Sequence, residues 1–294
     1  SRVIKKINPD LVVIIDGDFW PVFIDSVKKR STPIIVAGGR FNLIRPFYGY
    51  KIILTKEVLK KIDFFGMRSQ RDFDELSRFM GKADNLSLTG DLKFALLKNK
   101  EVPYATFEFI SDLKASKRKI FIAGSTHKGE EEIVLDAFLK LRNEFKDLLL
   151  VIAPREIDRV SEILNIIKVT GKKAILRSEI TGDIKKDIDI IILNTEGELF
   201  DIYSASSLAF VGGSLVYIER FGGHNILEPA YFGKAVFFGP FMHNFQYLGD
   251  VFEKRGIGFK VSNSLELTSA IKKVLIDQNI TTKILELDRK LLLK

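Results

Sequence analysis

Residues 208–229 read LAFVGGSLVYIERFGGHNILEP, and the rest of the chain is organised around this stretch. The apolar residues 208–211 predict a short buried strand, and the first glycine pair ends it where a loop must approach a ligand closely. After the second glycine pair, Asn225 is a suitable N-cap and Glu228 completes a capping-box pattern. Strand, glycine-rich loop and helix N-terminus together predict a site for phosphate or carboxylate. A capping box without a ligand is the alternative, but the paired glycines favour a ligand.

The composition bounds the class of protein. With 294 residues, 46% of them hydrophobic, the chain is globular and long enough for two domains. It has no cysteine, which excludes disulfides and thiolate metal sites, and its three histidines lie too far apart for a metal-ligand motif. Its apolar runs are of strand length and too short to span a bilayer. Because no signal peptide is found, the sequence is interpreted as that of a cytosolic or peripheral protein.

Positive charge is concentrated in the first third of the chain. Residues 1–100 carry 19 Lys and Arg against 11 Asp and Glu, whereas residues 101–294 carry 27 of each kind. This asymmetry predicts that the first third faces a phosphorylated substrate, an acidic membrane surface or nucleic acid. Nucleic acid is the least favoured, because no DNA- or RNA-binding motif accompanies the charge. A solvated basic face is the alternative.

Polar residues directly follow the predicted strands of the first third. Residues 11–15 form an apolar run without alternation, which is typical of a parallel strand covered on both faces, and Asp16 and Asp18 come next. Open α/β sheets bind ligands at the carboxyl ends of their strands, so Asp16 is predicted to be a site residue. Asp18 could instead be only a helix N-cap. Lys93 follows the predicted strand at 86–89 and a glycine, where it is either a surface charge or an anion clamp.

The second part of the chain repeats this arrangement. The predicted strand at 119–123 is followed by the loop GSTHKG and by three acids, residues 130–132, whose place in a first helical turn the helix dipole explains sufficiently. The predicted strand at 148–153 ends in Pro154-Arg155. Another, at 188–193, is followed by the turn that contains Glu196, Gly197 and Glu198.

Alternating strands and helices predict an α/β fold with two parallel sheets. The expected division is a first Rossmann-like domain at 1–100, a linker without clear periodicity at 101–118, a second Rossmann-like domain at 119–280 and a C-terminal helix at 281–294. Because the chain begins without methionine, we expect a piece to be missing upstream and the first domain to be partial. Two such domains facing each other form the glycosyltransferase B architecture, which does not by itself identify the chemistry.

Eight motifs, in this order, resemble those of the 3-deoxy-D-manno-oct-2-ulosonic acid (Kdo) transferases of lipopolysaccharide biosynthesis. They are DGDFWP (16–21), GDLKF (90–94), GSTHKGE (124–130), PR (154–155), EGEL (196–199), FVGGSLV (210–216), GGHN (222–225) and GP (239–240) with NF (244–245). Each motif alone is weak, but eight in order across nearly the whole chain are specific.

The resemblance implies a reaction and a set of site residues. The implied reaction moves Kdo from CMP-Kdo to a phosphorylated lipid A precursor, lipid IVA, at the cytoplasmic face of the inner membrane, with no bound metal or other cofactor. Asp16 and Lys93 fall on positions assigned to transition-state stabilisation. The positions that bind CMP fall on Pro154, Arg155, Glu196, Gly197, Glu198, Asn225, Ile226, Leu227 and Glu228.

The chain departs from the family pattern in three places. Asp16 and Asp18 stand where the family usually has Glu, and about three extra residues lie in the segment 217–221. No residue matches the general-base glutamate that the family has near its chain start. We therefore expect the first part of the acceptor domain, and any N-terminal membrane anchor, to be absent from this chain. Two alternative functions remain: a two-domain glycosyltransferase that uses a UDP-sugar, and an inactive nucleotide-binding remnant.

Overall fold

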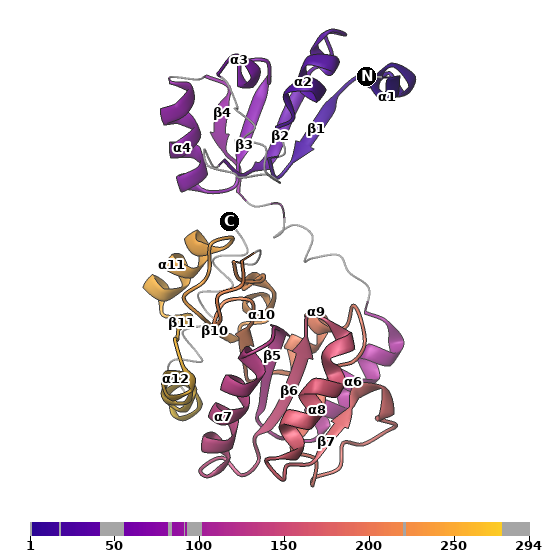
Figure 1. Cartoon of the computed structure of the whole chain (residues 1–294), viewed down its shortest axis with the longest axis vertical. Coiled ribbons are helices and arrows are strands. Elements are labelled where there is room, and N and C mark those ends of the chain that lie inside the picture. Colours follow the sequence, from indigo (N-terminus) through magenta and orange to yellow (C-terminus); the bar gives the residue numbers. More distant parts are fainter. Residues whose placement is uncertain are drawn as a thin grey trace. The chain divides into compact units, whose positions relative to one another are not determined.

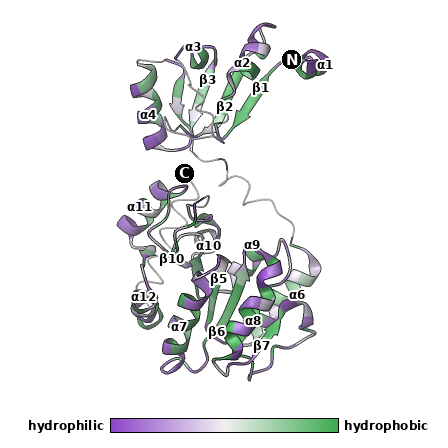
Figure 2. Cartoon of the chain, in the orientation of Figure 1, coloured by the Kyte–Doolittle hydropathy of each residue, from purple (hydrophilic) through white to green (hydrophobic). Residues whose placement is uncertain are grey.

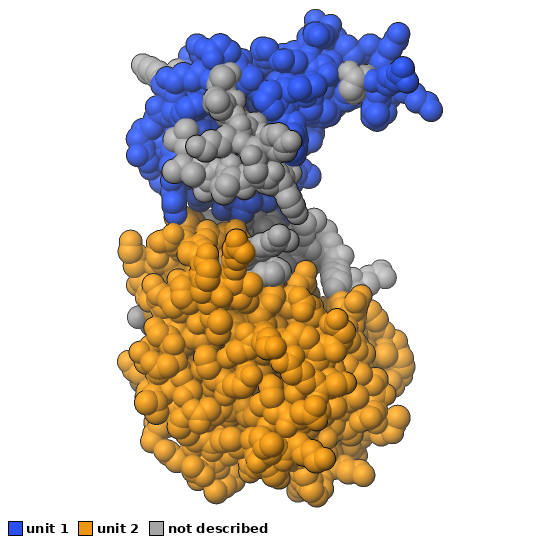
Figure 3. Space-filling view, viewed as in Figure 1, with its two compact units in different colours: residues 1–99 blue, residues 100–294 orange. Residues whose placement is uncertain are grey.

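The computed structural model describes residues 2–17, 19–41, 56–81, 84–90, 92, 102–219 and 222–277. The chain divides into two compact units, Ser1–Asn99 and Lys100–Lys294 (Figure 3). Each unit contains one sheet in which all paired strands are parallel (Figure 1). The predicted α/β class with two Rossmann-like domains is thereby confirmed. The C-terminal helix expected at 281–294 lies outside the described residues.

The first unit is a four-stranded sheet with the order β1-β2-β3-β4, so that each strand lies beside the next one in the sequence. Its elements are α1 (Arg2–Ile7), β1 (Val12–Ile15), α2 (Pro21–Lys28), β2 (Ile34–Gly39), α3 (Lys56–Leu59), β3 (Phe64–Met67), α4 (Gln70–Met80) and β4 (Leu86–Leu88). Its core includes Ile24, Ile34, Leu59, Phe65 and Leu76, which come from α2, β2, α3, β3 and α4. The helices therefore bury their apolar faces against this small sheet.

The expectation that β1 is covered on both faces is wrong. Ile14 is buried in the core of the first unit, but Val13 is 47% exposed and Ile15 is 66% exposed. Within the described residues β1 is an edge strand that pairs only with β2. An apolar run without alternation does not distinguish a strand covered on both faces from one whose second face is apolar and exposed.

The second unit is a seven-stranded sheet with the order β11-β10-β9-β5-β6-β8-β7. Its strands are β5 (Ile120–Thr126), β6 (Leu149–Pro154), β7 (Ala174–Leu176), β8 (Ile190–Ile192), β9 (Leu208–Val211), β10 (Ala235–Phe238) and β11 (Gly258–Lys260). Its helices are α6 (Tyr104–Ala115), α7 (Glu130–Arg142), α8 (Val160–Lys168), α9 (Leu199–Ile202), α10 (Leu227–Tyr231), α11 (Gln246–Arg255) and α12 (Ser264–Ile276), with short 3-10 turns at Ile157–Arg159, Arg177–Glu179 and Tyr203–Ala205. The four strands β6, β8, β9 and β10 are buried along their whole length, as expected for parallel strands covered on both faces. Figure 2 shows the strands of this sheet as predominantly hydrophobic.

The interval 101–118, expected to be a linker, contains helix α6, which belongs to the second unit. Its buried residues Thr106, Phe109, Ile110 and Leu113 have helical spacing, and the last three pack in one core with residues of β5, β6 and β8. The exposed aromatic residues Tyr104 and Phe107 lie outside the buried face and obscure this periodicity in the sequence. The linker prediction for this interval is therefore wrong.

The order of strands in the second unit reverses between β5 and β9. From β5 the chain moves to β6, then to the edge strand β7 and back to β8 between them. It then returns to β9, on the other side of β5, and continues outward through β10 to β11. In open parallel sheets, ligands bind at such a reversal, outside the carboxyl ends of the two strands. The loops that follow β5 and β9 are therefore the expected place for a ligand in this unit.

Candidate functional site

The loops after β5 and β9 are joined by one buried acid, Glu130. Its side chain accepts four backbone N–H groups: those of His127 at 2.9 Å and Gly213 at 2.8 Å on Oε2, and those of Ser214 at 3.0 Å and Leu215 at 2.8 Å on Oε1. The residue is 0% exposed. A buried carboxylate is tolerated only when hydrogen bonds replace its lost hydration, and these four donors do so. The helix dipole alone is thus not a sufficient explanation for an acid at this position.

The neighbouring acid, Glu131, is also buried, but it faces a different part of the unit. Its carboxylate accepts hydrogen bonds from both terminal nitrogens of Arg159, at 2.8 and 3.2 Å. This bidentate ion pair connects the start of α7 to the segment before α8. Two of the three acids at the start of α7 therefore have specific long-range partners.

The glycine pairs of residues 212–223 are packed against protein atoms. A side chain on Gly212 would place its Cβ 2.4 Å from the carbonyl oxygen of Ser125, and one on Gly223 would place it 2.4 Å from the sulfur of Met242. The two pairs also bond to each other, because the N–H of Gly223 donates to the carbonyl of Gly213 at 2.7 Å. Close approach of loop to loop therefore explains these glycines, and the argument that they favour a ligand is not needed.

Two histidines lie side by side where these loops meet. The rings of His127 and His224 are parallel to within 1°, and their Nε2 atoms are 2.8 Å apart. Burial lowers the pKa of His127, against the opposing effect of Glu130. Burial, then His127, then the positive charge of Arg155 lower the pKa of His224 to about 4. At neutral pH the pair is therefore uncharged, and one Nε2–H donates to the other Nε2.

Arg155, a predicted CMP-binding residue, lies near this pair. It follows β6, its backbone N–H donates to the carbonyl of Thr126 at 2.9 Å, and the residue is exposed. Its backbone bond places it beside the end of β5, and its positive charge lowers the pKa of His224. Pro154 is buried at the end of β6. The structure thus brings Arg155 together with the loops after β5 and β9.

The predicted residues Glu196, Gly197 and Glu198 form a turn after β8. Glu196 and Gly197 are exposed, and Gly197 has a positive φ of 81° with open space around it. Glu198 is buried, and its carboxylate accepts hydrogen bonds from the hydroxyl of Thr106 at 2.9 Å and from Arg177 at 3.2 Å. Its side chain therefore anchors this turn to α6 and is not presented to solvent.

The capping prediction at Asn225 is wrong in its register. Helix α10 begins at Leu227 and has Ile226 as its N-cap, and the side-chain oxygen of Asn225 accepts the N–H of Leu227 at 3.2 Å. The side-chain nitrogen of Asn225 donates to Glu228 at 3.2 Å. Because α10 has only five residues, it supplies little dipole for a phosphate. Ile226 and Leu227 are buried, whereas Asn225 and Glu228 are half-buried.

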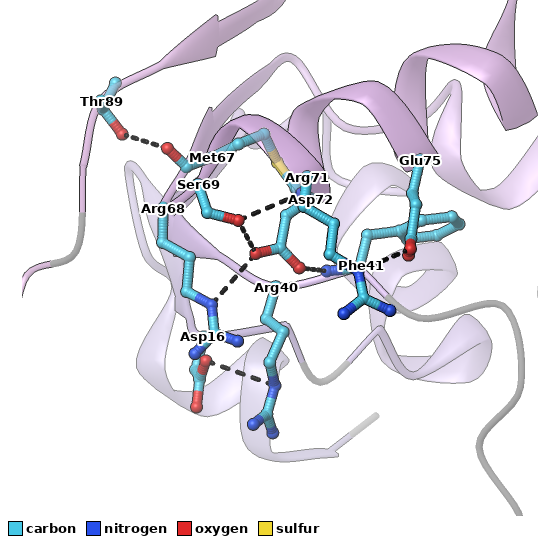
Figure 4. Close-up of polar contacts among 10 residues, drawn as sticks. All are labelled: Asp16, Arg40, Phe41, Met67, Arg68, Ser69, Arg71, Asp72, Glu75 and Thr89. Atoms are coloured by element: carbon cyan, nitrogen blue, oxygen red, sulfur yellow. Dashed lines mark hydrogen bonds and ion pairs between the residues drawn. The ribbon is translucent and has the colours of Figure 1, made fainter. Parts of the chain in front are cut away.

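The first unit gathers charged residues at the carboxyl ends of its strands (Figure 4). Asp16 follows β1 in a left-handed conformation with φ of 70°, and its carboxylate is 3.8 Å from Nε of Arg40, which follows β2. Arg68 follows β3 and donates to the buried Asp72 at 3.1 Å. Asp72 also accepts the N–H of Phe41 at 2.9 Å and so holds the segment after Arg40. Two carboxylates and two guanidinium groups therefore mark this edge of the sheet.

Sequence reasoning did not select Arg40 or Arg68 as candidates, although each directly follows a strand. The other predicted residues of this unit, Asp18 and Lys93, lie outside the described residues. Among the described residues, no three His, Cys, Asp or Glu side chains are gathered closely enough to hold a metal ion. None of the helices that the structure describes has the length and apolar character that a membrane span requires.

Comparison with known proteins identifies the family. The family profile of the 3-deoxy-D-manno-octulosonic-acid transferases (kdotransferases) matches residues 1–96. The 3-deoxy-D-manno-octulosonic acid transferase of Aquifex aeolicus is 30% identical over 268 residues, which cover 91% of this chain and 66% of that protein. This chain belongs to the Kdo transferase family. The membership confirms the resemblance carried by the eight motifs.

Two further relatives define how far the similarity extends. A bifunctional glycosyltransferase/methyltransferase of Fusobacterium nucleatum is 34% identical over 282 residues, which cover 95% of this chain and 43% of that protein. Among solved structures, the C-terminal CMP-Kdo binding domain of WaaA from Acinetobacter baumannii is 26% identical with a TM-score of 0.59, and the match covers 65% of this chain and 100% of that domain. The chain thus spans less than half of the Fusobacterium nucleatum protein and about two thirds of the Aquifex aeolicus transferase.

Proposed function

We propose that this chain is a glycosyltransferase that moves Kdo from CMP-Kdo to a phosphorylated lipid A precursor, lipid IVA, in lipopolysaccharide biosynthesis. The observation that carries the proposal is the similarity to a CMP-Kdo binding domain that matches over its whole length. The membership in the Kdo transferase family supports the transferred sugar. The second unit is the donor-binding part in this proposal, because it contains the strand reversal at which a nucleotide would bind.

In the second unit, Arg155 and the segment 225–228 are proposed to hold CMP. The exposed guanidinium of Arg155 is suited to the donor phosphate, because it is always charged and can form two parallel hydrogen bonds to it. Glu228 is half-buried and can accept hydrogen bonds from the ribose hydroxyls. Ile226 and Leu227 are buried and can contribute only backbone groups, as can Pro154. The exposed Glu196 and Gly197 complete the proposed nucleotide site.

Charge stabilisation explains how such a site would speed the reaction. As the bond between Kdo and CMP breaks, negative charge builds on the phosphate and the sugar gains oxocarbenium character. A fixed cation such as Arg155 stabilises the leaving phosphate without reorganisation. Asp16, held at a strand end, is proposed to stabilise the positive sugar, and Lys93 the negative carboxylate or phosphate. No metal ion or other cofactor is part of the proposed mechanism.

The first unit is proposed to face the acceptor. Its excess of positive charge suits the phosphates of a lipid A precursor and the anionic leaflet in which that lipid lies. Arg40 and Arg68, at the carboxyl ends of β2 and β3, pair with Asp16 and Asp72. We propose that the protein works at the cytoplasmic face of the inner membrane, with no part for nucleic acid.

Calorimetric titration with CMP, UDP and GDP tests the proposal. The expected result is that CMP binds more tightly than UDP or GDP. Equal affinity for all three, or a preference for UDP, would reject CMP-Kdo as the donor and support a UDP-sugar transferase. No binding of any nucleotide would reject the nucleotide site itself.

A further inference from the structure

Glu130 connects three segments of the second unit through the loop 212–215. The N–H groups of residues 213–215 all point to its carboxylate. The carbonyls of the same loop hold two later segments: Gly212 accepts the N–H of His224 at 3.1 Å, and Ser214 accepts the N–H of Phe241 at 2.8 Å. The loop is thus bonded on its inner side to Glu130 and on its other side to the segment that leads into Asn225–Glu228.

The geometry requires a carboxylate at this position. Each oxygen of Glu130 accepts two N–H groups, so both oxygens act as double acceptors. In glutamine one of these oxygens becomes an NH2 group, which would face two N–H donors and could not bond to either. The loop would then have to move away from α7, and His224 and the segment after it would follow, because their N–H groups are bonded to the loop carbonyls.

We propose that Glu130 is a positioning residue for the donor site: through the loop 212–215 it holds His224 and the segment Asn225–Glu228 in the conformation that binds CMP. The inference rests on the proposed function, since CMP binding is what the positioning serves. Glu130 itself is fully buried and behind the loop, so it acts through the loop and makes no contact with a ligand. It lies near the carboxyl ends of β5 and β9, where the order of strands reverses and where small displacements of the loops alter the ligand site most directly.

The neighbouring Glu131 provides a matched control. It is equally buried and lies on the same helix, but it pairs with Arg159 and makes none of the bonds to the loop. The experiment compares Glu130→Gln and Glu131→Gln in the whole chain by two measurements, CMP titration calorimetry and hydrogen exchange of the amides at 213–215, 223 and 224. Thermal unfolding of both variants reports the loss of stability that any change to a buried acid causes.

Glu130→Gln should weaken CMP binding about tenfold or more, because a displaced donor site would lose at least one hydrogen bond to a charged group of CMP. It should also raise the exchange rates of the amides at 213–215, 223 and 224. Glu131→Gln should lower the melting temperature but leave CMP affinity within about twofold and these exchange rates unchanged. Intact CMP affinity in Glu130→Gln, or an equal loss of affinity in both variants, would overturn the proposal.

The exchange measurement separates this proposal from the proposed function. If the unaltered chain binds no CMP, the proposed function fails, whereas faster exchange confined to Glu130→Gln still shows that Glu130 holds the loop. If Glu130→Gln does not fold, exchange in the unaltered chain decides: the amides at 213–215 must be protected without nucleotide, and fast exchange there would overturn the proposal. Glu130→Asp, which keeps the charge but shortens the reach, should then also weaken CMP binding.

Discussion

The pair His127–His224 predicts a loss of stability in mildly acidic solution. Both side chains are held uncharged in the folded second unit, because burial lowers both pKa values and the positive charge of Arg155 lowers that of His224 further. In the unfolded chain they return to the ordinary histidine pKa of 6.5. Acidification therefore adds protons to the unfolded chain before the folded one, so the free energy of unfolding falls as the pH drops below about 6.5.

The magnitude follows from the pKa of His224. With a folded pKa of about 4 and an unfolded pKa of 6.5, the stabilisation lost between about pH 7.5 and about pH 5 is about 2 kcal/mol, and the loss continues until the pH is well below 4. His127 shifts in the same direction and adds to this loss. The acids Glu130, Glu131 and Glu156 around His127 oppose its shift, and Arg159 reinforces it.

Urea unfolding at a series of pH values measures this effect unit by unit. All three histidines lie in the second unit, whereas the single tryptophan, Trp20, lies in the first. Circular dichroism follows the whole chain, and Trp20 fluorescence follows the first unit as an internal control. The transition of the second unit should lose about 2 kcal/mol or more between about pH 7.5 and about pH 5, and the Trp20 transition should not show this histidine step.

The variant His224→Gln removes the titrating group and keeps a polar side chain. It should be less sensitive to pH in this range than the unaltered chain, because the contribution of His224 is removed and only that of His127 remains. A flat stability profile of the unaltered second unit would refute the reasoning. The same slope in His224→Gln would show that other groups cause the dependence.

Arg155→Ala should weaken CMP binding by about 1.5–3 kcal/mol, roughly 10- to 150-fold in calorimetry, the usual value for a hydrogen bond to a charged group. Lys173→Ala, at a 65% exposed side chain that precedes β7 and so lies away from the carboxyl ends of the strands, is the control and should change affinity less than about twofold. Gly124→Ala should lower the free energy of unfolding by about 1–3 kcal/mol in urea, because the new Cβ would lie 1.9 Å from the hydroxyl of Tyr203, and an unchanged midpoint would show that the tyrosine moves freely. The expectation from the sequence that the family's general-base glutamate has no counterpart here gives a further prediction: if it holds, the 294-residue chain should bind CMP but transfer no detectable Kdo, because a positioned base contributes ~10²–10⁴-fold. The Aquifex aeolicus transferase is the positive control, and robust transfer by this chain would make Asp18 the first residue to mutate.

The sequence determined the class of fold because each element carries its own local pattern. The local patterns predict a strand at 64–67 and helices at 70–80 and 264–276, and the structure has β3 (Phe64–Met67), α4 (Gln70–Met80) and α12 (Ser264–Ile276) with these bounds. In both helices a side chain one residue before the start, Ser69 or Asn263, caps the helix, and such a cap is visible in the sequence. Helix α6 was missed because its exposed aromatic residues obscure the buried face.

The motifs also determined the family, since their order along the chain needs no knowledge of contacts. They indicated that Pro154-Arg155, the turn at Glu196 and the segment at Asn225 belong to one site, and their role in binding CMP stays a prediction. The structure shows only that Arg155 lies near the loops after β5 and β9 and that Glu198 has its carboxylate turned inward.

The tertiary structure alone decided what holds the loops. Three of the four hydrogen bonds that Glu130 accepts join residues 83 to 85 positions apart, and the histidine pair joins residues 97 positions apart. Local patterns report spacing along one element, whereas these contacts depend on which strands are neighbours in the sheet. For the same reason the glycine pairs favoured a ligand in the sequence, and in the fold they are the places where the loop packs closely against the backbone or side chains of other segments.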